Sequence, residues 1–482
     1  MRSIACLSSL LLMLTSYPAI AAEIQLTELQ NSNDVAPLCP SDLPTAIEKI
    51  IDRPELARSH WGIEIQTAGE TLYSLNGNKF FIPASSAKLL TTAAVLLQLG
   101  ADYRLDTPIF AVGNPPNLDT LRLQGRGDPT ITTKSLKNIV HQLQGLGVEK
   151  IEKLIIDDSY FQPPTINPTW EWLDVHSYFA TAVNSTILNQ NSVTLTLLPQ
   201  QIGEPVKFYW SDRIAGRQWQ VINQAITGAT DIPYDIEIDG DLGKPVLQIR
   251  GKLAENEPPD VWDLAIVDPA NYFLESLRLQ LERSGIKVTK GIVVKEAEPD
   301  KLEIKLLSIS SPSIAEIIKV TNQESNNLYA EAIAHSLAQQ LGLSTIEAVD
   351  RSLVELGINP EEYVLVDASG LSRQNLVTPQ ALAKTLSSMS QKFPLISQVY
   401  LKSLAVAGIS GTLKNRLNNI EGDLFGKTGS LTGVASLTGY MFVPDYPTII
   451  LSIIVNNSNL KSKDLRQTID EIIILIDRLS EC

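Results

Sequence analysis

The chain has 482 residues, of which 44% are hydrophobic, and its 54 acidic residues outnumber its 39 basic ones to give a formal net charge of −15. This length and composition predict a globular protein of two or three domains. An acidic chain lacks the basic surface that a phosphate backbone needs, so we do not expect nucleic acid as a partner.

Residues 1–22 have the pattern of a secretory signal peptide. Arg2 supplies a positive charge, Cys6 to Leu14 form an apolar run, and the small residues Ala19 and Ala21 suit cleavage. The run is too short to span a membrane, and no later stretch reaches the roughly 18 uninterrupted apolar residues that a span needs. We therefore expect an exported protein that loses its signal peptide and has no integral membrane span.

Cysteine and histidine usage adds two expectations. Removal of the signal peptide leaves Cys39 and Cys482, which could form one bridge between the ends of the chain in an oxidising compartment. A terminal residue can equally remain frayed. The four histidines are scattered and none has ligand spacing with a cysteine, so we expect no metal site and no cofactor.

The predicted elements, taken in chain order, divide into three stretches. A helix near Ile47 leads to two strands, and Asn76-Gly77 predicts a hairpin to the next extended piece before a long apolar helix at 81–100. Between residues 104 and 307 we expect short strands and helices on both sides of a stretch at 190–252. In that stretch apolar and polar residues alternate as they do in strands. The predicted helices of the rest of the chain are 136–146, 269–284, 314–320, 326–341, 344–356, 379–392 and 463–479, and its last strands are 435–443 and 448–455.

The two ends of the chain share one pattern, strands accompanied by a covering helix. The economical topology is an α/β (α+β) fold with a single antiparallel sheet built from both ends and covered by helices, into which another domain is inserted.

Ser85 and Lys88 are the first candidates for chemistry. They lie three residues apart near the start of the helix at 81–100, so their side chains share one face. A hydroxyl needs a partner to take its proton before it attacks a carbonyl, and a lysine in an apolar place near another cation can be neutral enough to do so. The pattern is weak alone, because Ser458 and Lys461 repeat it in a polar connection and because a snorkelling lysine at a helix start would look the same.

Two further clusters lie in the C-terminal half. Ser325 and Asn327 open a helix, where an ordinary N-cap would use the same residue types. The segment Lys427-Thr428-Gly429-Ser430 combines a cation, two hydroxyls and a glycine that lets another backbone approach, on a stretch that otherwise resembles an edge strand before a turn.

Together and in this order, the three clusters resemble the signature of penicillin-binding proteins and serine β-lactamases. The separation of 240 positions from Ser85 to Ser325 narrows the resemblance to the class C low-molecular-mass penicillin-binding proteins, the D-alanyl-D-alanine carboxypeptidase/endopeptidase family. Asn326 stands where that family often has Asp, and Ser430 where it often has Thr. Further matching segments are Gly127–Thr130, Asp157–Phe161, Trp170–Trp172, Asp367–Arg373 and Ser410–Leu413.

The resemblance implies an organisation and a location. A transpeptidase-like catalytic domain would comprise residues 23–100 and 308–482, with an inserted domain II at 101–189 and 253–307. A mostly-β domain III at 190–252 would be nested inside domain II. The protein would act in the periplasm on peptidoglycan stem peptides, without a cofactor, and would be acylated by β-lactam antibiotics.

The resemblance also implies roles for single residues. Ser85 would attack the carbonyl between two D-alanines, with Lys88 taking its proton. Ser325 would pass a proton to the leaving amine, and Asn327 would hold Lys88 and the substrate. The terminal carboxylate would bind to Lys427 with the hydroxyls of Thr428 and Ser430, beside Gly429. Backbone N–H groups of Ser85 and Ser430 would form an oxyanion hole, and Asp157 with Arg373 would hold the charged end of a diaminopimelate side chain, although Asp157 also fits a plain turn residue.

Three other functions compete with this one. A β-lactamase or esterase on the same fold would lack the long insertion, and a catalytically dead cell-wall-binding protein would not need every motif residue. A Ser-His-Asp hydrolase would need a Gly-x-Ser-x-Gly elbow, which the sequence lacks. The balance of carboxypeptidase and endopeptidase action, the stem-peptide residue, the oligomeric state and any membrane association stay open at the level of sequence.

Overall fold

The computed structural model describes residues 37–67, 70–241, 243–296 and 300–482. The predicted signal peptide at 1–22 lies outside the described residues. Within them, every helix is too short or too polar to cross a membrane, and no cluster of three or more His, Cys, Asp or Glu side chains could hold a metal ion.

One antiparallel sheet combines strands from both ends of the chain, in the order β18-β19-β20-β21-β1-β2. The pairing of β1 with β21 confirms the sheet that the sequence predicted. All residues of β20 and β21 are buried, because helices cover both faces of the sheet. The strands are β1 (His60–Gln66), β2 (Thr71–Leu75), β18 (Ala405–Val406), β19 (Leu424–Leu431), β20 (Val434–Met441) and β21 (Ile449–Asn456).

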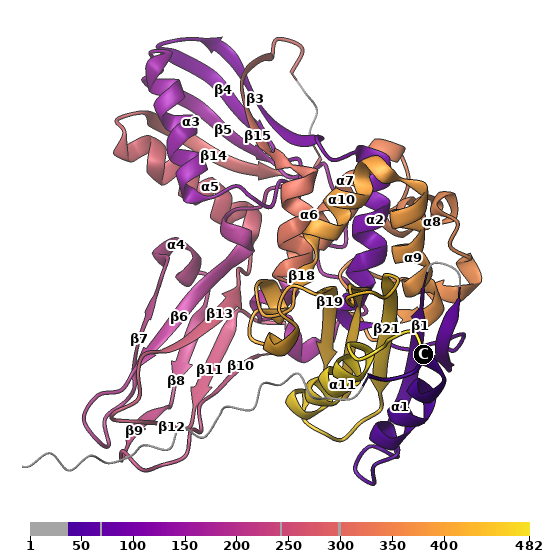
Figure 1. The fold of residues 1–482 in the computed structure, drawn as a ribbon. Helices are drawn as coiled ribbons and strands as arrows, with labels where there is room; N and C mark the ends of the chain where they lie inside the picture. The colour runs from indigo at the N-terminus through magenta and orange to yellow at the C-terminus, as the bar shows by residue number, and fades with distance from the viewer. Residues whose placement is uncertain (1–36, 68–69, 242, 297–299) are drawn as a thin grey trace, which may run out of the picture. The chain divides into compact units, whose positions relative to one another are not determined.

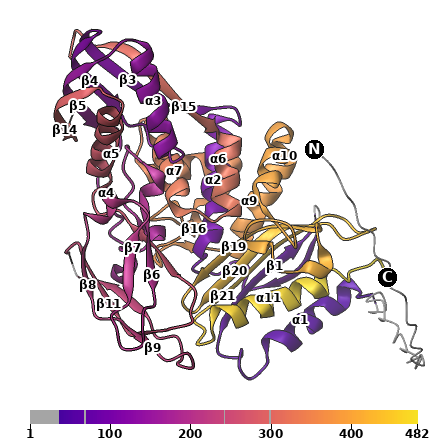
Figure 2. The ribbon, with the colours of Figure 1, turned by 90° about the vertical axis from the view of Figure 1, so that its left-hand side faces the viewer.

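Two helical layers enclose this sheet (Figure 2). On one face α1 (Leu43–Ile51) and α11 (Ser462–Ile476) pack on one another and on apolar strand residues such as Leu437 and Ile453. On the other face α2 (Lys88–Leu99) is apolar on nearly all sides, so it is buried among several helices. These helices are α6 (Ile314–Gln323), α7 (Asn327–Leu341), α8 (Thr345–Leu356), α9 (Pro379–Lys392) and α10 (Pro394–Ser403).

The segment between α2 and α6 forms further sheets. The largest has the order β14-β5-β4-β3-β15, and α3 and α5 pack on one face of it (Figure 1). The α3 helix connects β4 to β5, which are parallel and therefore need a crossover. The elements are β3 (Arg104–Asn114), β4 (Asn117–Gln124), β5 (Lys150–Asp157), β14 (Lys287–Val294), β15 (Ile304–Ser313), α3 (Thr133–Gly145) and α5 (Pro269–Arg283).

Small sheets follow between residues 192 and 265, with strand orders β13-β6-β7, β10-β11-β8 and β12-β9. Because β13 pairs with β6, this β-structure continues past residue 252, where the predicted domain III ends. The nested division remains our proposal, with β13 added to domain III. The elements are β6 (Ser192–Leu198), β7 (Lys207–Trp210), α4 (Arg213–Gly216), β8 (Gln220–Asn223), β9 (Ile226–Gly228), β10 (Glu237–Gly240), β11 (Val246–Arg250), β12 (Lys252–Ala254) and β13 (Asp260–Ala265).

The hairpin predicted at Asn76-Gly77 is wrong. The hairpin instead joins β1 to β2, and the chain after β2 makes only an isolated bridge between Phe81 and Val377 of β17 (Leu376–Val377), the partner of β16 (Tyr363–Val364). Asn76 does adopt a left-handed φ of 52°, but its side-chain amide donates to the Trp61 carbonyl at 2.9 Å. After this turn the chain therefore does not pair with β2 and continues through Phe81 to α2.

A disulfide joins Cys39 to Cys482, with their Cα atoms 5.7 Å apart. Nearby backbone contacts accompany it, since the Leu38 N–H donates to the Arg478 carbonyl at 2.7 Å. The two ends of the described chain are thereby held together beside α1 and α11.

Candidate active site

Ser85 lies in a 3₁₀ turn, Ala84–Ala87, that leads directly into α2. In a 3₁₀ turn, side chains three residues apart eclipse one another, which brings Ser85 over Lys88. Ala84 has a left-handed φ of 48°, a conformation that costs energy for a residue with a Cβ and that often occurs at functional sites. The turn is held by Ser436 of β20, whose hydroxyl donates to the Pro83 carbonyl at 2.8 Å.

The side-chain nitrogen of Lys88, Nζ, lies at the centre of the site. It lies 3.0 Å from Ser85 Oγ, 2.6 Å from Asn327 Oδ1 and 2.6 Å from the Ser369 carbonyl oxygen. A neutral lysine has two N–H donors and one lone pair. The two carbonyl-type oxygens can accept only from those donors, so the lone pair of the neutral amine is left for the Ser85 hydroxyl.

Burial favours this neutral state. Lys88 has no exposed surface, and the loss of solvation lowers its pKa to about 7, against the opposing influence of the Asp367 and Glu331 charges. A substantial fraction of the amine is therefore unprotonated near neutral pH.

Lys427 on β19 is a second buried lysine at the site. Its Nζ donates to Ser325 Oγ at 2.8 Å and to the Thr428 carbonyl at 2.7 Å. Burial, and then the charge of Lys88, hold the pKa of Lys427 well below its ordinary value. Two positive charges this close disfavour each other, so the site tends to hold fewer than two protonated lysines.

Ser325 and Asn327 reach the site from the start of α7. Ser325 adopts a left-handed φ of 57°, and the Asn326 side chain then caps the helix by accepting from the Tyr329 N–H at 3.0 Å. The ordinary N-cap interpretation of this cluster therefore fits Asn326, which leaves Ser325 and Asn327 for the site. The Asn327 amide also donates to the Phe179 carbonyl at 2.8 Å, so the inserted segment contributes to one wall.

The sequence predicted no role for two buried acidic residues that act on Lys88, Glu331 and Asp367. Glu331 Oε1 accepts from the backbone N–H groups of Ala368 and Ser369 at 3.0 and 2.9 Å, which orients the Ser369 carbonyl toward Lys88. Burial, and then the Asp367 charge, raise the pKa of Glu331 to about 8. Asp367 accepts from the Gly370 N–H and the Trp170 indole at 2.7 and 2.9 Å. One signal in the sequence could have pointed to Glu331, because it is an acidic residue within the otherwise apolar, Ala-rich part of α7.

The strand β19 presents the Lys-Thr-Gly segment beside the Ser85 turn. A Cβ at Gly429 would lie 2.7 Å from the Pro83 carbonyl oxygen, so only glycine permits this approach of strand and turn. Thr428 Oγ1 donates to Thr412 Oγ1 at 2.7 Å, while Ser430 is exposed at the end of the strand. The structure thus brings Ser85, Lys88, Ser325, Asn327 and the Lys427–Ser430 segment together.

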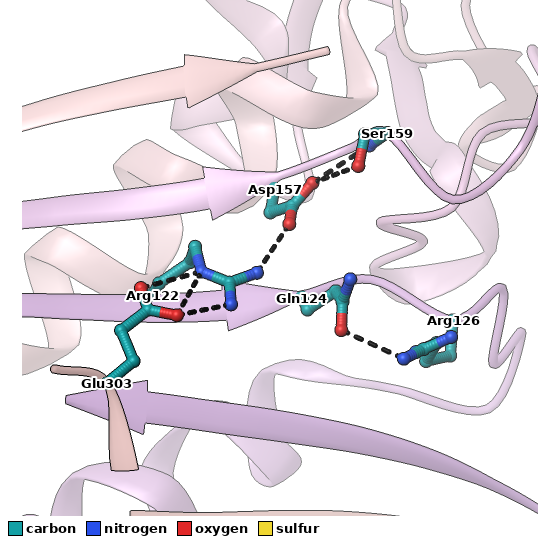
Figure 3. Close-up of polar contacts among 6 residues, drawn as sticks. All are labelled: Arg122, Gln124, Arg126, Asp157, Ser159 and Glu303. Carbon is teal, nitrogen blue, oxygen red and sulfur yellow. Dashed lines mark hydrogen bonds and ion pairs between the residues drawn. The ribbon is translucent and has the colours of Figure 1, made fainter. Parts of the chain in front are cut away.

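Asp157 and Arg373 are not joined to each other. The Asp157 carboxylate is fully buried at the end of β5, where it accepts from Arg122 Nη1 and the Ser159 hydroxyl, both at 2.6 Å (Figure 3). Arg122 is buried too and also pairs with Glu303. The Arg373 side chain is 29% exposed and contacts Glu171 at 2.9 Å. A side-chain-binding role is therefore open to Arg373, whereas the oxygens of Asp157 are taken up by internal partners.

The chain is similar to known proteins over most of its length. Residues 43–475 match the model of the D-Ala-D-Ala carboxypeptidase 3 (S13) family. The chain is 28% identical to penicillin-sensitive carboxypeptidase A of Dictyostelium discoideum over 467 residues, covering 87% of each chain. It is 29% identical to a D-alanyl-D-alanine carboxypeptidase of an Actinomadura species over 446 residues, covering 87% of this chain and 81% of the relative.

A solved structure shows the same fold. Penicillin binding protein 4 (DacB) of Haemophilus influenzae superposes with a TM-score of 0.78 at 22% identity, covering 91% of this chain and 99% of that one. At that level of identity the match shows the fold alone, a mixed α/β fold like that of the penicillin-binding protein.

Proposed function

The chain belongs to the D-Ala-D-Ala carboxypeptidase 3 (S13) family, as its motif order predicted, and we propose that it removes the terminal D-alanine of peptidoglycan stem peptides through an acyl-enzyme on Ser85. Family membership makes it a serine-type hydrolase. The observation that carries the residue assignment is the position of Lys88 Nζ, within hydrogen-bonding distance of Ser85 Oγ and Asn327 Oδ1.

Acylation would begin with a proton transfer from the Ser85 hydroxyl to the lone pair of neutral Lys88. The Ser85 oxygen forms a bond to the carbonyl carbon of the penultimate D-alanine, and the C–N bond to the last D-alanine breaks. Ser325, whose oxygen accepts a hydrogen bond from Lys427, gives a proton to the departing amine. The proton that Lys88 took from Ser85 replaces the one that Ser325 lost, so Lys88 is neutral again. Water then attacks the acyl-enzyme with Lys88 again as base, which releases the shortened peptide and restores Ser85.

The substrate would lie along β19. Its terminal carboxylate would meet the hydroxyls of Thr428 and Ser430 and the positive field of Lys427. The backbone N–H groups of Ser85 and Ser430 would stabilise the oxyanion, a contribution of roughly 3–4 kcal/mol per donor in other acyl-transfer enzymes. Penicillin would acylate the same serine, in line with the penicillin-sensitive relative and the penicillin-binding structure.

Endopeptidase action fits the same chemistry, because it also breaks the bond that follows a D-alanine. An exported, periplasmic location follows from the substrate and from the N-terminal pattern, and the disulfide between Cys39 and Cys482 supports an oxidising compartment.

Purified protein should release D-alanine from a synthetic peptide that ends in D-Ala-D-Ala, and should shorten or uncouple isolated muropeptides. Mass spectrometry of the products separates the two activities, since a carboxypeptidase removes one residue and an endopeptidase separates cross-linked stems. Rapid penicillin hydrolysis without peptide cleavage would instead support the β-lactamase alternative and contradict the proposed substrate.

Acylation by penicillin should accelerate with pH through neutrality. With the pKa of Lys88 at about 7, its neutral fraction rises about tenfold between roughly pH 6 and pH 8, and the rate should follow the base form. The second-order rate constant for labelling with fluorescent penicillin, measured across this range, checks the expectation. A flat or falling profile would show that Lys88 does not act as the base in this protonation state.

A further inference from the structure

A cavity of about 450 Å³ adjoins the β19 end of the candidate active site. Thr428 and Ser430, the residues proposed to bind the terminal carboxylate, form one wall of it. Residues of the first two turns of α11, among them Lys463 and Arg466, line the same cavity together with Arg416. We call this the α11 cavity.

The charges that line the α11 cavity do not cancel. Arg416 is neutralised by Asp470, to which it donates two hydrogen bonds at 2.7 and 3.1 Å. Lys463 and Arg466 are different, because in the part of the chain that the structure describes neither side chain has an acidic partner within ion-pair distance. Two uncompensated positive charges therefore face this cavity, on a chain whose net charge is −15.

The position of the cavity determines which part of a substrate could enter it. A peptide whose terminal carboxylate lies at Thr428 and Ser430 has its leaving residue at the mouth of the cavity. When that residue is D-alanine, only a methyl group is available. When the leaving amine belongs to a larger residue or to a second peptide, its additional carboxylates would extend between Lys463 and Arg466.

We infer that the α11 cavity is a subsite for anionic leaving groups, in which Lys463 and Arg466 select peptides that carry a second carboxylate beyond the scissile bond. This inference rests on the proposed function and deepens it, because such a subsite would favour cross-linked peptides with acidic leaving halves over plain D-Ala-D-Ala ends. Steering of this kind is electrostatic, so it should weaken with salt.

The test compares two synthetic peptides that differ in one group, one ending in D-Ala-D-Glu and the other in D-Ala-D-Gln. The ratio of their kcat/KM values reports only the response to the extra carboxylate. We expect wild type to favour D-Glu, and the variant K463Q/R466Q to lower this ratio about 2- to 10-fold, as for the loss of two partly exposed charge pairs. K414Q/K461Q removes two exposed lysines that do not line the cavity and should keep the wild-type ratio.

An unchanged ratio in K463Q/R466Q, or an equal fall in K414Q/K461Q, would overturn the subsite. If K463Q/R466Q does not fold, the salt dependence of the wild-type kcat/KM ratio tests the inference. The preference for D-Glu should fall between roughly 50 and 500 mM salt, and a salt-independent ratio would reject the inference. Failure of the proposed function looks different. In that case wild type would cleave neither peptide and would not be labelled by penicillin.

Discussion

Replacing Ser85 with alanine should abolish covalent labelling by penicillin and cleavage of D-Ala-D-Ala peptides. The hydroxyl oxygen is the atom that would form the acyl bond, and no other nucleophile in the site can replace it within reach of Lys88 Nζ, whose remaining contacts are the Asn327 and Ser369 carbonyl-type oxygens. Gel fluorescence with labelled penicillin and mass spectrometry of the intact protein measure the loss directly.

The chain supplies a matched control for that substitution. Ser458 begins the second Ser-x-x-Lys sequence, but it lies in the connection between β21 and α11, where its hydroxyl accepts from the Leu460 N–H at 3.3 Å. Ser458→Ala should label like wild type. Labelling that persists in Ser85→Ala would refute the assignment of Ser85 as the nucleophile.

Replacing Lys88 with alanine should slow acylation by about 10²- to 10⁴-fold, the usual contribution of a positioned general base. The variant should fold with lower stability than wild type, because alanine leaves a cavity and removes the donor of the Asn327 and Ser369 oxygens. The acylation rate of the variant should also lose the rise near pH 7. Stopped-flow acylation across pH measures both effects, with circular dichroism as the check on folding.

Lys461→Ala provides the corresponding control, since Lys461 is the exposed lysine of the second Ser-x-x-Lys sequence. It should leave both the rate and its pH profile as in wild type. An acylation rate in folded Lys88→Ala equal to that of wild type would remove Lys88 as the base and would direct attention to Lys427, the other buried lysine of the site.

The two lysines illustrate how the fold produces reactivity from ordinary residues. Each comes from an element that is buried for reasons of packing, α2 within the helical layer and β19 between β18 and β20. Burial lowers the pKa of both amines. Each amine also lies within hydrogen-bonding distance of a hydroxyl, that of Ser85 for Lys88 and that of Ser325 for Lys427.

The sequence by itself determined the elements and the motif residues. Apolar periodicity, capping residues and strand alternation are local, so α2, α7 and the strands of the central sheet lie close to their predicted positions. The order of the motifs at Ser85, Ser325 and Lys427 predicted the family, and the family match over residues 43–475 confirms it.

Only the tertiary structure decided which partners these residues meet. Asp157 has a motif position but pairs with Arg122 of the neighbouring strand, and Glu331 acts on the turn at Ala368 and Ser369. Lys463 and Arg466 of α11 line one cavity with Thr428 and Ser430 of β19, although more than 30 residues separate them in the sequence. Each contact joins segments far apart in the chain, and its geometry depends on how whole layers pack, which no local pattern encodes.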